Sequence, residues 1–294
     1  MSAEERRAYA HCERMARRHY ENFPVASLLL PARMRPHIAA IYAFARRADD
    51  FADEPGIPDA ERIRLLAGWR ARLRAAAATP APAHAPADGD DLIFRALRAT
   101  VTRHALPLSL FEDLLSAFEQ DVSTTRYPSW DHVLDYCRRS ANPVGRLVLR
   151  VAGYTDPRLD DASDAVCTAL QLTNFWQDLG RDWDGGRLYV PLADLDRFGA
   201  READLADRRM TDQWRAVLAA VAERTRGLFL AGRAVCDGVT GRLRWELRLT
   251  WLGGRRVLDK VERARRVSFD RRPTLGIRDL PPIVRDAVLW PRTR

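Results

Sequence analysis

Residues 174–182 have the sequence Asn174-Phe175-Trp176-Gln177-Asp178-Leu179-Gly180-Arg181-Asp182 and end an apolar pattern of helical spacing that begins near residue 159. Asp178 and Asp182 are four residues apart, and on a helix this spacing places both carboxylates on one face. Asn174 extends the same face by one more turn. We therefore predict a helix over residues 159–182 whose last turns present three oxygen-bearing side chains together.

A second stretch repeats this arrangement over residues 46–54, with the sequence Arg46-Arg47-Ala48-Asp49-Asp50-Phe51-Ala52-Asp53-Glu54. Asp49 and Asp53 are again four residues apart, near the end of a predicted helix over residues 34–51. Carboxylates at this spacing repel each other, so each pair costs stability unless a cation offsets the repulsion. Two matching sets on apolar helices favour a shared function, although two solvated helix ends remain the simpler alternative.

The carboxylates of both stretches are suited to Mg²⁺, which prefers oxygen ligands and completes its coordination with water and substrate phosphates. If the two helices face each other, Asp49, Asp53, Asp178 and Asp182 would form a cage for a metal–diphosphate ion. The sequence therefore predicts a diphosphate site built around two acidic helices.

Several side chains near the acidic stretches could bind phosphate. Arg46 precedes Asp49 by three residues, and Arg187 and Tyr189 follow the second stretch on a Gly-rich turn. A guanidinium group presents a planar fork of donors that matches phosphate oxygens. His19 could also reach a phosphate. An ordinary structural or surface role stays open for each of them, because arginine is abundant throughout the chain.

The segment Tyr136-Cys137-Arg138-Arg139-Ser140-Ala141-Asn142-Pro143-Val144-Gly145 places small residues and a proline inside an otherwise apolar helical pattern. Proline removes a backbone donor and kinks a helix. Small side chains there would let a bulky apolar ligand approach the backbone. A simple packing kink is the alternative interpretation.

Helical periodicity continues along the rest of the chain. We predict further helices over residues 3–22, 59–77, 92–104, 108–122, 130–152, 209–235, 241–268 and 276–288. The Ala- and Pro-rich residues 75–90 are predicted to form a surface loop. Because neither alternating strand patterns nor heptads appear, we predict an all-α fold, with residues 1–294 forming one helical domain around a central cavity.

The amino-acid composition indicates which binding partners and which cellular compartment to expect. The formal charge is +8, and nearly all the cations are arginine, with Lys260 the only lysine. We find neither zinc-ligand spacing nor an RNA-binding signature, so no nucleic acid partner is expected. The four cysteines are widely spaced, and the first residues lack an apolar signal core, which indicates free thiols in the cytoplasm. A basic surface could still contact anionic lipid headgroups.

Other enzyme classes find no support in the sequence. The chain lacks a nucleophile elbow, a P-loop and a G-x-G-x-x-G fingerprint. Nucleophilic catalysis, nucleotide hydrolysis and dinucleotide binding are therefore not expected.

From about His19 to Pro273, the chain resembles the squalene/phytoene synthase family of head-to-head prenyl synthases. The segments that carry the resemblance are Ile41-Tyr42-Ala43-Phe44-Ala45-Arg46, Tyr136-Cys137 with Val144-Gly145, Leu170-Gln171-Leu172-Thr173-Asn174, and Gly186-Arg187-Leu188-Tyr189-Val190-Pro191. Within the family, Asn22-Phe23-Pro24-Val25-Ala26-Ser27 and Ser140-Ala141-Asn142-Pro143-Val144-Gly145 are most similar to bacterial hydroxysqualene synthases of the hopanoid route.

The resemblance implies an isoprenoid-synthase fold and a defined set of site residues. The implied Mg²⁺ ligands are Asp49, Asp53, Asn174, Asp178 and Asp182, and the four aspartates are implied to be catalytic. The implied substrate-binding residues are His19, Tyr42, Arg46, Tyr136, Gln171, Gln177, Arg187 and Tyr189. The chain departs from many relatives at Gln177, Arg181 and Gly254, where arginine, glutamate and tyrosine are common.

The implied reaction is Mg²⁺-assisted ionisation of presqualene diphosphate, rearrangement of the carbocation and capture by water to give hydroxysqualene, without NADPH. Two alternatives stay open. One is condensation of two prenyl diphosphates to presqualene diphosphate or phytoene, and the other is a non-catalytic assembly subunit. The expected partners are a prenyl diphosphate substrate, other squalene-pathway enzymes and, peripherally, the inner face of the cell membrane.

Overall fold

The computed structural model describes residues 1–18, 29–78, 88–263 and 272–291. The chain divides into two compact units, one made of Met1–Ser123 with Pro143–Thr155 and the other of Thr124–Asn142 with Asp156–Arg294. Within the described ranges every regular element is a helix, apart from an isolated bridge between Arg126 and Leu188. The all-α prediction is confirmed, whereas the single-domain organisation stays a prediction.

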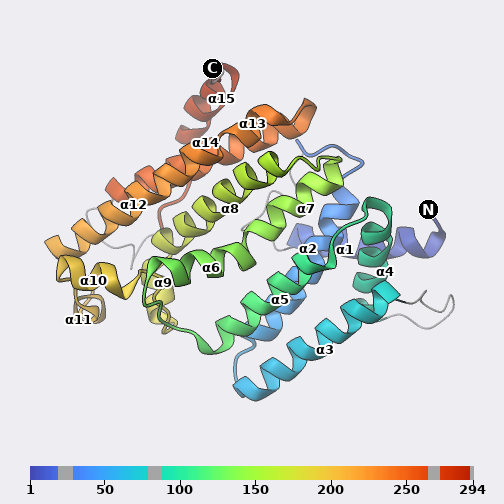
Figure 1. Ribbon diagram of the computed structural model, residues 1–294, viewed down its shortest axis with the longest axis horizontal. Helices are drawn as coiled ribbons and strands as arrows, with labels where there is room; N and C mark the ends of the chain where they lie inside the picture. Colours follow the sequence, from blue (N-terminus) through green and yellow to red (C-terminus); the bar gives the residue numbers. More distant parts are fainter. Residues whose placement is uncertain (19–28, 79–87, 264–271, 292–294) are drawn as a thin grey trace. The chain divides into compact units, whose positions relative to one another are not determined.

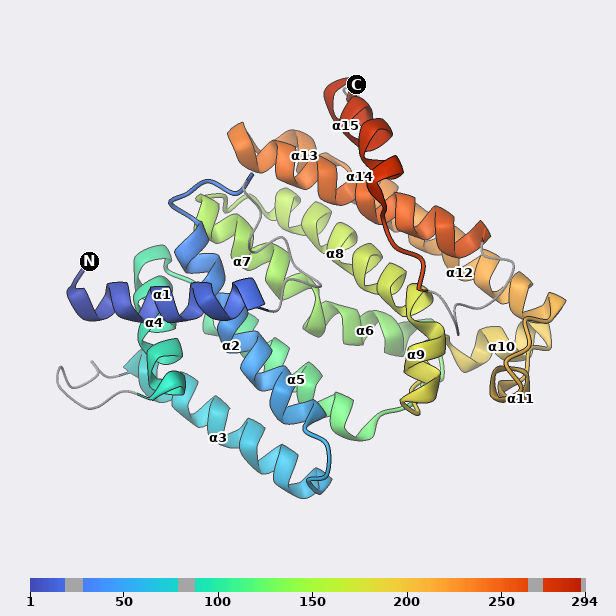
Figure 2. The same ribbon diagram turned by 180° about the vertical axis from the view of Figure 1, so that it is seen from behind.

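The first unit is a bundle of helices (Figures 1 and 2). Its helices are α1 (Ala3–Arg18), α2 (Arg35–Asp53), α3 (Asp59–Ala78), α4 (Gly89–His104), α5 (Leu108–Ser123) and most of α7 (Asn142–Ala152). Helix α2 is apolar on most of its circumference and packs against α1, α3, α4 and α5. A helix buried on several sides must lie at the centre of its bundle, so α2 forms the core of this unit.

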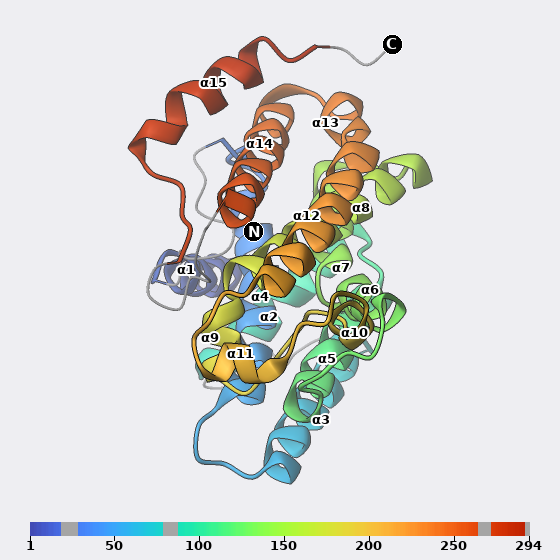
Figure 3. The same ribbon diagram turned by 90° about the vertical axis from the view of Figure 1, so that its left-hand side faces the viewer.

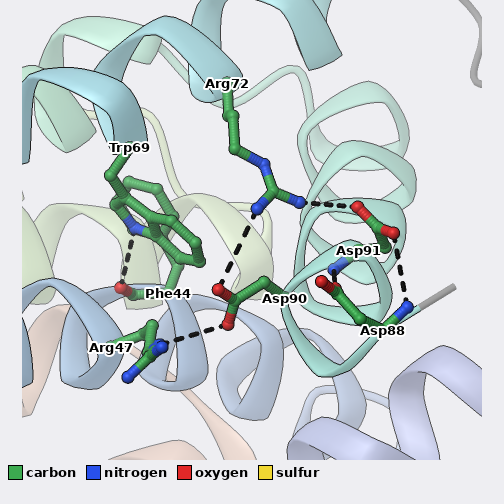
Figure 4. Close-up of polar contacts among 7 residues, drawn as sticks. All are labelled: Phe44, Arg47, Trp69, Arg72, Asp88, Asp90 and Asp91. Carbon is green, nitrogen blue, oxygen red and sulfur yellow. Dashed lines mark hydrogen bonds and ion pairs between the residues drawn. The ribbon is translucent and has the colours of Figure 1, made fainter. Parts of the chain in front are cut away.

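Aromatic rings fill the space around α2. The Phe44 ring stacks on Trp69 of α3 at a centroid distance of 5.7 Å and meets Phe94 and Phe111 edge-on. The Trp69 indole also donates to the Phe44 carbonyl oxygen at 3.3 Å (Figure 4). Large rings that also satisfy their polar atoms fix α2 firmly against its neighbours. The acidic end of α2 is therefore carried by a rigid element.

The second unit contains the remaining helices (Figures 1 and 3). They are α6 (Trp130–Ser140), α8 (Pro157–Gln177), α9 (Leu179–Asp184), α10 (Leu192–Phe198), α11 (Glu202–Ala206), α12 (Asp212–Gly232), α13 (Ala234–Gly238), α14 (Gly241–Arg263), the 3-10 turn η2 (Ile277–Asp279) and α15 (Leu280–Val288). Helix α8 packs against α6, α12, α13 and α14, so it is the central helix of this unit.

Glycines let the neighbours of α8 approach closely. A Cβ atom at Gly232 of α12 would lie 2.6 Å from the Ala162 carbonyl oxygen, and one at Gly254 of α14 would lie 2.5 Å from Leu170 Cδ2. Real Cβ atoms do not make such contacts, so Gly232, which faces backbone, requires glycine, and a side chain at Gly254 would force Leu170 and Phe229 to shift. The same close approach leaves no room at Gly254 for a large side chain.

The helix boundaries differ from the predictions at several places. The predicted helix over residues 130–152 is two helices, because Pro143 lacks a backbone donor and the chain breaks at Ala141. The predicted helix over residues 159–182 is likewise divided at Asp178, close to the weak helix former Gly180. The short helices α10 and α11 were not predicted.

The predicted loop over residues 75–90 is shorter at both ends than the sequence suggested. Helix α3 continues to Ala78, and α4 begins at Gly89. An Asp88–Asp91 capping box starts α4 there, since each carboxylate accepts from the other residue's backbone N–H (Figure 4). Residues 79–87 lie outside the described part of the chain.

Candidate active site

The second acidic stretch lies where α8 ends and α9 begins. The Asp178 backbone N–H donates to the Asn174 carbonyl oxygen at 2.8 Å, and the Asp182 N–H donates to the Asp178 carbonyl oxygen at 2.9 Å. These two bonds continue the helical spacing across the break between the helices. The Asn174 amide also donates to Asp178 Oδ2 at 2.8 Å. Asn174, Asp178 and Asp182 therefore still follow one another along one side of the chain.

Asp182 is an acidic group in an environment that disfavours its charge. Burial, followed by repulsion from Asp178, raises the pKa of Asp182 to about 7. Three arginines, Arg187, Arg272 and Arg181, act in the opposite direction without offsetting these effects. A cation beside Asp182 would remove the penalty. The oxygen donors at this position therefore fit a divalent metal ion.

Asp178 is held by a residue far along the chain. Arg272 forms two hydrogen bonds with it, from Nε to Oδ1 at 2.5 Å and from Nη2 to Oδ2 at 2.8 Å. The neighbouring Gln177 donates its side-chain amide to the Pro273 carbonyl oxygen. The residues 272–279, which we call the return segment, are thus attached to the end of α8.

The far end of the return segment is also fixed. The buried Asp279 accepts hydrogen bonds from the Gly276 backbone N–H and from Arg256 and Lys260 of α14. These donors hold the pKa of the Asp279 carboxyl well below its usual range. Anchored at both ends, the return segment keeps Arg272 beside Asp178.

The turn after α9 carries Arg187 and Tyr189 back toward the acidic residues. Gly186 adopts a left-handed conformation with φ of 82°, which suits glycine. The Arg187 backbone N–H then donates to the Asp182 carbonyl oxygen at 2.7 Å. Arg126 fixes this turn, since its Nη1 donates to the Gly186 carbonyl oxygen at 2.7 Å. Its guanidinium also pairs with Glu202 at 2.8 Å.

A group of stacked rings lies directly beside the second acidic stretch. The Tyr189 ring is stacked on Phe175 with centroids 3.7 Å apart, and Tyr136 of α6 lies 6.0 Å from each of them. Tyr136 and Tyr189, which the sequence placed in one site, are therefore close together. Gln171, a further predicted residue, is half-buried on α8 three residues before Asn174.

The first acidic stretch is the C-terminal end of α2. Arg46 bridges two carboxylates, with Nη1 3.2 Å from Asp49 Oδ2 and Nη2 2.7 Å from Asp50 Oδ1. Burial raises the pKa of Tyr42, the charge of Arg46 lowers it, and the charges of Asp49 and Asp50 raise it again, so Tyr42 belongs to the same group. Asp53 is exposed at the helix end.

Arg47 points to a different part of the first unit from Arg46. Its Nε donates to Asp90 at 3.1 Å, and Arg72 pairs with Asp91 at 2.6 Å (Figure 4). The guanidinium of Arg47 also lies 4.5 Å from the centre of the Phe51 ring. Arg47 thus connects α2 to α4, whereas Arg46 is the arginine associated with the acidic residues.

His19 lies outside the described residues. Among the residues that are described, His, Cys, Asp and Glu side chains form no group of three or more that could hold a metal by themselves. The two acidic stretches belong to different units, so the structure describes each one alone. The joint metal site remains a prediction from the sequence.

The sequence did not identify Arg272 and Arg126 as site residues. Arg272 is 94 residues away from Asp178, and no local pattern connects them. Arg126 precedes a Tyr-Pro pair that looks like an ordinary helix boundary. Only a three-dimensional arrangement could distinguish these arginines from the others in the chain.

Comparison with known proteins settles the family. A family profile described as squalene/phytoene synthase matches residues 16–279. The chain belongs to the squalene/phytoene synthase family. Enzymes of this family process prenyl diphosphates, which agrees with the predicted class of prenyl diphosphate enzyme. Helices long and apolar enough to cross a membrane are not found in the described ranges.

Two of the similar proteins are named hydroxysqualene synthase. The chain is 40% identical to hydroxysqualene synthase from Zymomonas mobilis over 189 residues, covering 63% of this chain and 59% of that protein. It is 37% identical to hydroxysqualene synthase from Sinorhizobium fredii over 230 residues, covering 77% of this chain and 74% of the relative. The first match thus spans less than two thirds of the relative's length.

A solved structure in the same family confirms the fold. The crystal structure of squalene synthase HpnC from Alicyclobacillus acidocaldarius superposes with a TM-score of 0.81 at 40% identity, covering 90% of this chain and 96% of that one. The isoprenoid-synthase fold predicted from the motifs is therefore correct.

Proposed function

We propose that this family member converts presqualene diphosphate and water into hydroxysqualene and diphosphate. The observation that carries the proposal is its 37–40% identity to three proteins named hydroxysqualene synthase. The segment Ser140-Ala141-Asn142-Pro143 and the departures at Gln177 and Arg181 support it from the sequence.

We assign metal binding to the two acidic stretches. Asp49 and Asp53 from the first, with Asn174, Asp178 and Asp182 from the second, would hold Mg²⁺. Bound there, Mg²⁺ would act as a Lewis acid that stabilises the departing diphosphate. The half-buried Asp182 supports this assignment, because burial and the charge of Asp178 disfavour its ionised form and a neighbouring cation would offset both.

Basic side chains would complete the diphosphate site. Arg46 lies on α2 and Arg187 on the turn after α9, each beside carboxylates of one acidic stretch, so both could contact a metal–diphosphate ion from where they stand. His19 and Gln171 are assigned to the same group from the family motifs. Fixed guanidinium charges aimed at a leaving anion stabilise it most strongly in the transition state.

The proposed reaction breaks the carbon–oxygen bond of presqualene diphosphate, and the diphosphate leaves with the electron pair. The cyclopropylcarbinyl cation rearranges, a water oxygen forms the new carbon–oxygen bond, and a proton is released. Tyr42, Tyr136, Gln177 and Tyr189 are proposed to contact the substrate near the reacting carbon. No hydride is transferred, so NADPH is not required.

A second candidate is the condensation of two prenyl diphosphates. It is favoured by the name squalene synthase that the related crystal structure carries, and by phytoene synthases with 28–30% identity. A non-catalytic assembly subunit is disfavoured, because a scaffold has no need for carboxylates that repel each other.

The proposal also implies a place in the cell. Presqualene diphosphate must come from a head-to-head condensing enzyme, so functional association with other squalene-pathway enzymes is expected. A position in the cytoplasm, peripheral to the inner face of the cell membrane, belongs to the same proposal.

The test compares two substrates. Pure protein with Mg²⁺ and without NADPH is given either presqualene diphosphate or farnesyl diphosphate, and the lipids are extracted and analysed. Hydroxysqualene from presqualene diphosphate alone supports the proposal. Product from farnesyl diphosphate alone supports condensation instead, and turnover of neither by folded protein supports the assembly subunit.

A further inference from the structure

Helix α15 and the preceding turn η2 expose an apolar stripe. Ile277, Leu280, Val284 and Val288 are spaced by three, four and four residues, so they follow one face of the helix. Their exposed fractions are 86%, 52%, 51% and 61%. We call these four residues the α15 stripe. A row of half-exposed aliphatic side chains on one helix indicates a contact surface.

The stripe is distinct from the face that holds α15 in the second unit. Ile283 and Ala287 are buried on a neighbouring face, and α15 packs against α14, outside which it lies in Figures 1 and 3. Trp290 is buried after the helix, with its indole nitrogen 3.0 Å from Asp237. One apolar face of α15, with Ile283 and Ala287, is therefore packed in the protein core. The α15 stripe is a second apolar face and is exposed to solvent.

Contacts with α14 hold helix α15 in place at both of its ends. At its start, Asp279 is fixed by Arg256 and Lys260 of α14. At its end, the Trp290 ring lies 5.2 Å from Trp251 of α14. Because the backbone is held in this way, the stripe would not need to become ordered on binding, which lowers the entropic cost of docking.

Positive charge flanks the stripe. Arg278 and Arg285 are seven residues apart and exposed, so they share a second face of the helix beside the stripe. The two acidic residues here are already paired, Asp279 with α14 and Asp286 with Arg285 at 2.8 Å. Because Asp286 offsets much of the Arg285 charge, Arg278 supplies most of the net positive charge of this basic border beside the exposed aliphatic side chains.

An exposed tryptophan lies on the neighbouring helix. Trp245 of α14 is 40% exposed. The Arg248 guanidinium lies 5.6 Å from the Trp245 ring and 5.1 Å from the Trp290 ring, and it donates to the Ala287 carbonyl oxygen at 3.3 Å. Arg248 thus connects Trp245 to the end of α15. Tryptophan and arginine prefer the headgroup level of a membrane.

We propose that the α15 stripe docks this protein on the surface of a bilayer that contains anionic lipids. Aliphatic side chains would enter the boundary between headgroups and acyl chains, while Arg278 and Arg285 would meet lipid phosphates. The choice of a bilayer over a protein partner rests on the basic border, on the net charge of +8 and on the proposed function, in which substrate and product are both lipids.

The experiment measures vesicle binding without any substrate. Full-length protein is floated with phosphatidylcholine vesicles, either pure or containing phosphatidylglycerol. Leu280→Ser/Val284→Ser/Val288→Ser removes most of the stripe, and Ile63→Ser, which changes an exposed aliphatic residue of α3, is the control. We expect binding to anionic vesicles that the triple variant weakens about tenfold or more. The Ile63→Ser variant should bind like wild type.

Charge reversal tests the second part of the surface. Arg278→Glu/Arg285→Glu should lose most of the preference for anionic vesicles, and added salt should weaken wild-type binding in the same way. Equal vesicle binding by wild type and the triple variant, with both folded, would overturn the proposal. Wild-type dimers that the triple variant converts to monomers, without a change in vesicle binding, would assign the stripe to a second copy instead.

Failure of the docking surface is separable from failure of the proposed function. The triple variant should turn over detergent-dispersed presqualene diphosphate at the wild-type rate but lose activity on substrate embedded in vesicles. Vesicle binding with no turnover in detergent would refute the function alone. Turnover in detergent with no vesicle binding by wild type would refute the docking surface alone.

Discussion

Arg272 and Asp178 form a bidentate ion pair that joins the return segment to the end of α8. The side chains are only 23% and 14% exposed, so the pair is shielded from much of the solvent. In the proposed enzyme Asp178 also binds Mg²⁺. The metal and the Arg272 guanidinium would therefore compete for the Asp178 carboxylate. By neutralising part of the negative charge of Asp178, Arg272 would weaken metal binding there.

Arg272→Ala tests this relationship. Removing the arginine leaves a half-buried carboxylate without its partner, so the variant should lose about 1–2 kcal/mol of stability without metal. Mg²⁺ should then raise its melting temperature more than that of wild type. Arg278→Ala, an exposed arginine of the same segment, is the control. An equal Mg²⁺-induced shift in all three proteins would show that Arg272 and the metal do not compete.

Asp182→Asn tests the metal assignment at the second acidic stretch. The variant keeps the shape of the side chain but removes a charge, so kcat should fall about 100-fold or more. Asp184→Asn is the matched control, because Asp184 is exposed and pairs with Arg208 at 3.1 Å. Steady-state rates with presqualene diphosphate measure the effect. Wild-type kcat in Asp182→Asn would remove this residue from the site.

Arg126→Ala tests whether the turn that carries Arg187 and Tyr189 must be fixed. Loss of the bonds to Gly186 and Glu202 should lower kcat/KM by about 10- to 100-fold, because small displacements of binding groups are costly. Arg126→Lys should recover part of the activity. Arg158→Ala, whose side chain is 91% exposed, should behave as wild type. If Arg126→Ala alters the melting temperature but leaves kcat/KM unchanged, the turn does not position the substrate.

Gly254 provides a test of close packing between α14 and α8. A Cβ atom there would lie 2.5 Å from Leu170 Cδ2 and 2.8 Å from Phe229 Cζ, so Gly254→Ala should destabilise the protein by about 1–3 kcal/mol. Gly227→Ala in α12 is the matched control, since no atom lies within 4 Å of the added methyl. Alanine favours helix at Gly227, so that variant should be neutral or slightly more stable. Denaturant unfolding measures both, and equal stability would contradict the packing.

His37 makes stability depend on pH. Burial, followed by the charges of His104 and Arg103, lowers the pKa of His37 to about 4, below the ordinary value near 6.5. The ring accepts or donates hydrogen bonds at Nδ1 with Thr100 at 3.0 Å and Tyr9 at 3.2 Å. Between pH 6.5 and 4, His37 is protonated in the unfolded chain but stays neutral in the folded protein. Stability is therefore complete above pH 6.5 and falls as the pH drops toward 4, by up to ~3 kcal/mol.

The histidine effect is measured as the slope of unfolding free energy against pH. His37→Gln should reduce this slope between pH 4 and 6.5, even if the variant is less stable overall. His132→Gln, which changes an exposed histidine, is the control. An unchanged slope in His37→Gln would assign the acid sensitivity to other groups.

The helices could be predicted from the sequence because their apolar residues follow helical spacing. Ile38, Ile41 and Phe44 on α2 are examples, and all three are buried. The helix breaks were harder to place. Asp178 keeps its backbone hydrogen bond to Asn174 while leaving helical geometry, and nothing in the local pattern marks that change. Helices α10 and α11, with seven and five residues, are too short for periodicity to show.

The site could be predicted only in part, for a related reason. Carboxylates four residues apart are a local signal, so Asp49, Asp53, Asp178 and Asp182 could be proposed as site residues from spacing alone. Arg272 reaches Asp178 across 94 residues, and Arg126 reaches the Gly186 turn across 60. Such contacts depend on how helices pack, which a single sequence with many arginines does not specify.

The most direct test of the proposed chemistry is the origin of the oxygen in the product. Pure protein, Mg²⁺ and presqualene diphosphate are incubated without NADPH in water enriched in oxygen-18, and the extracted alcohol is analysed by mass spectrometry. Ionisation followed by water capture predicts hydroxysqualene that carries oxygen-18. An unlabelled presqualene alcohol would show that the diphosphate is cleaved at phosphorus, and would contradict the account.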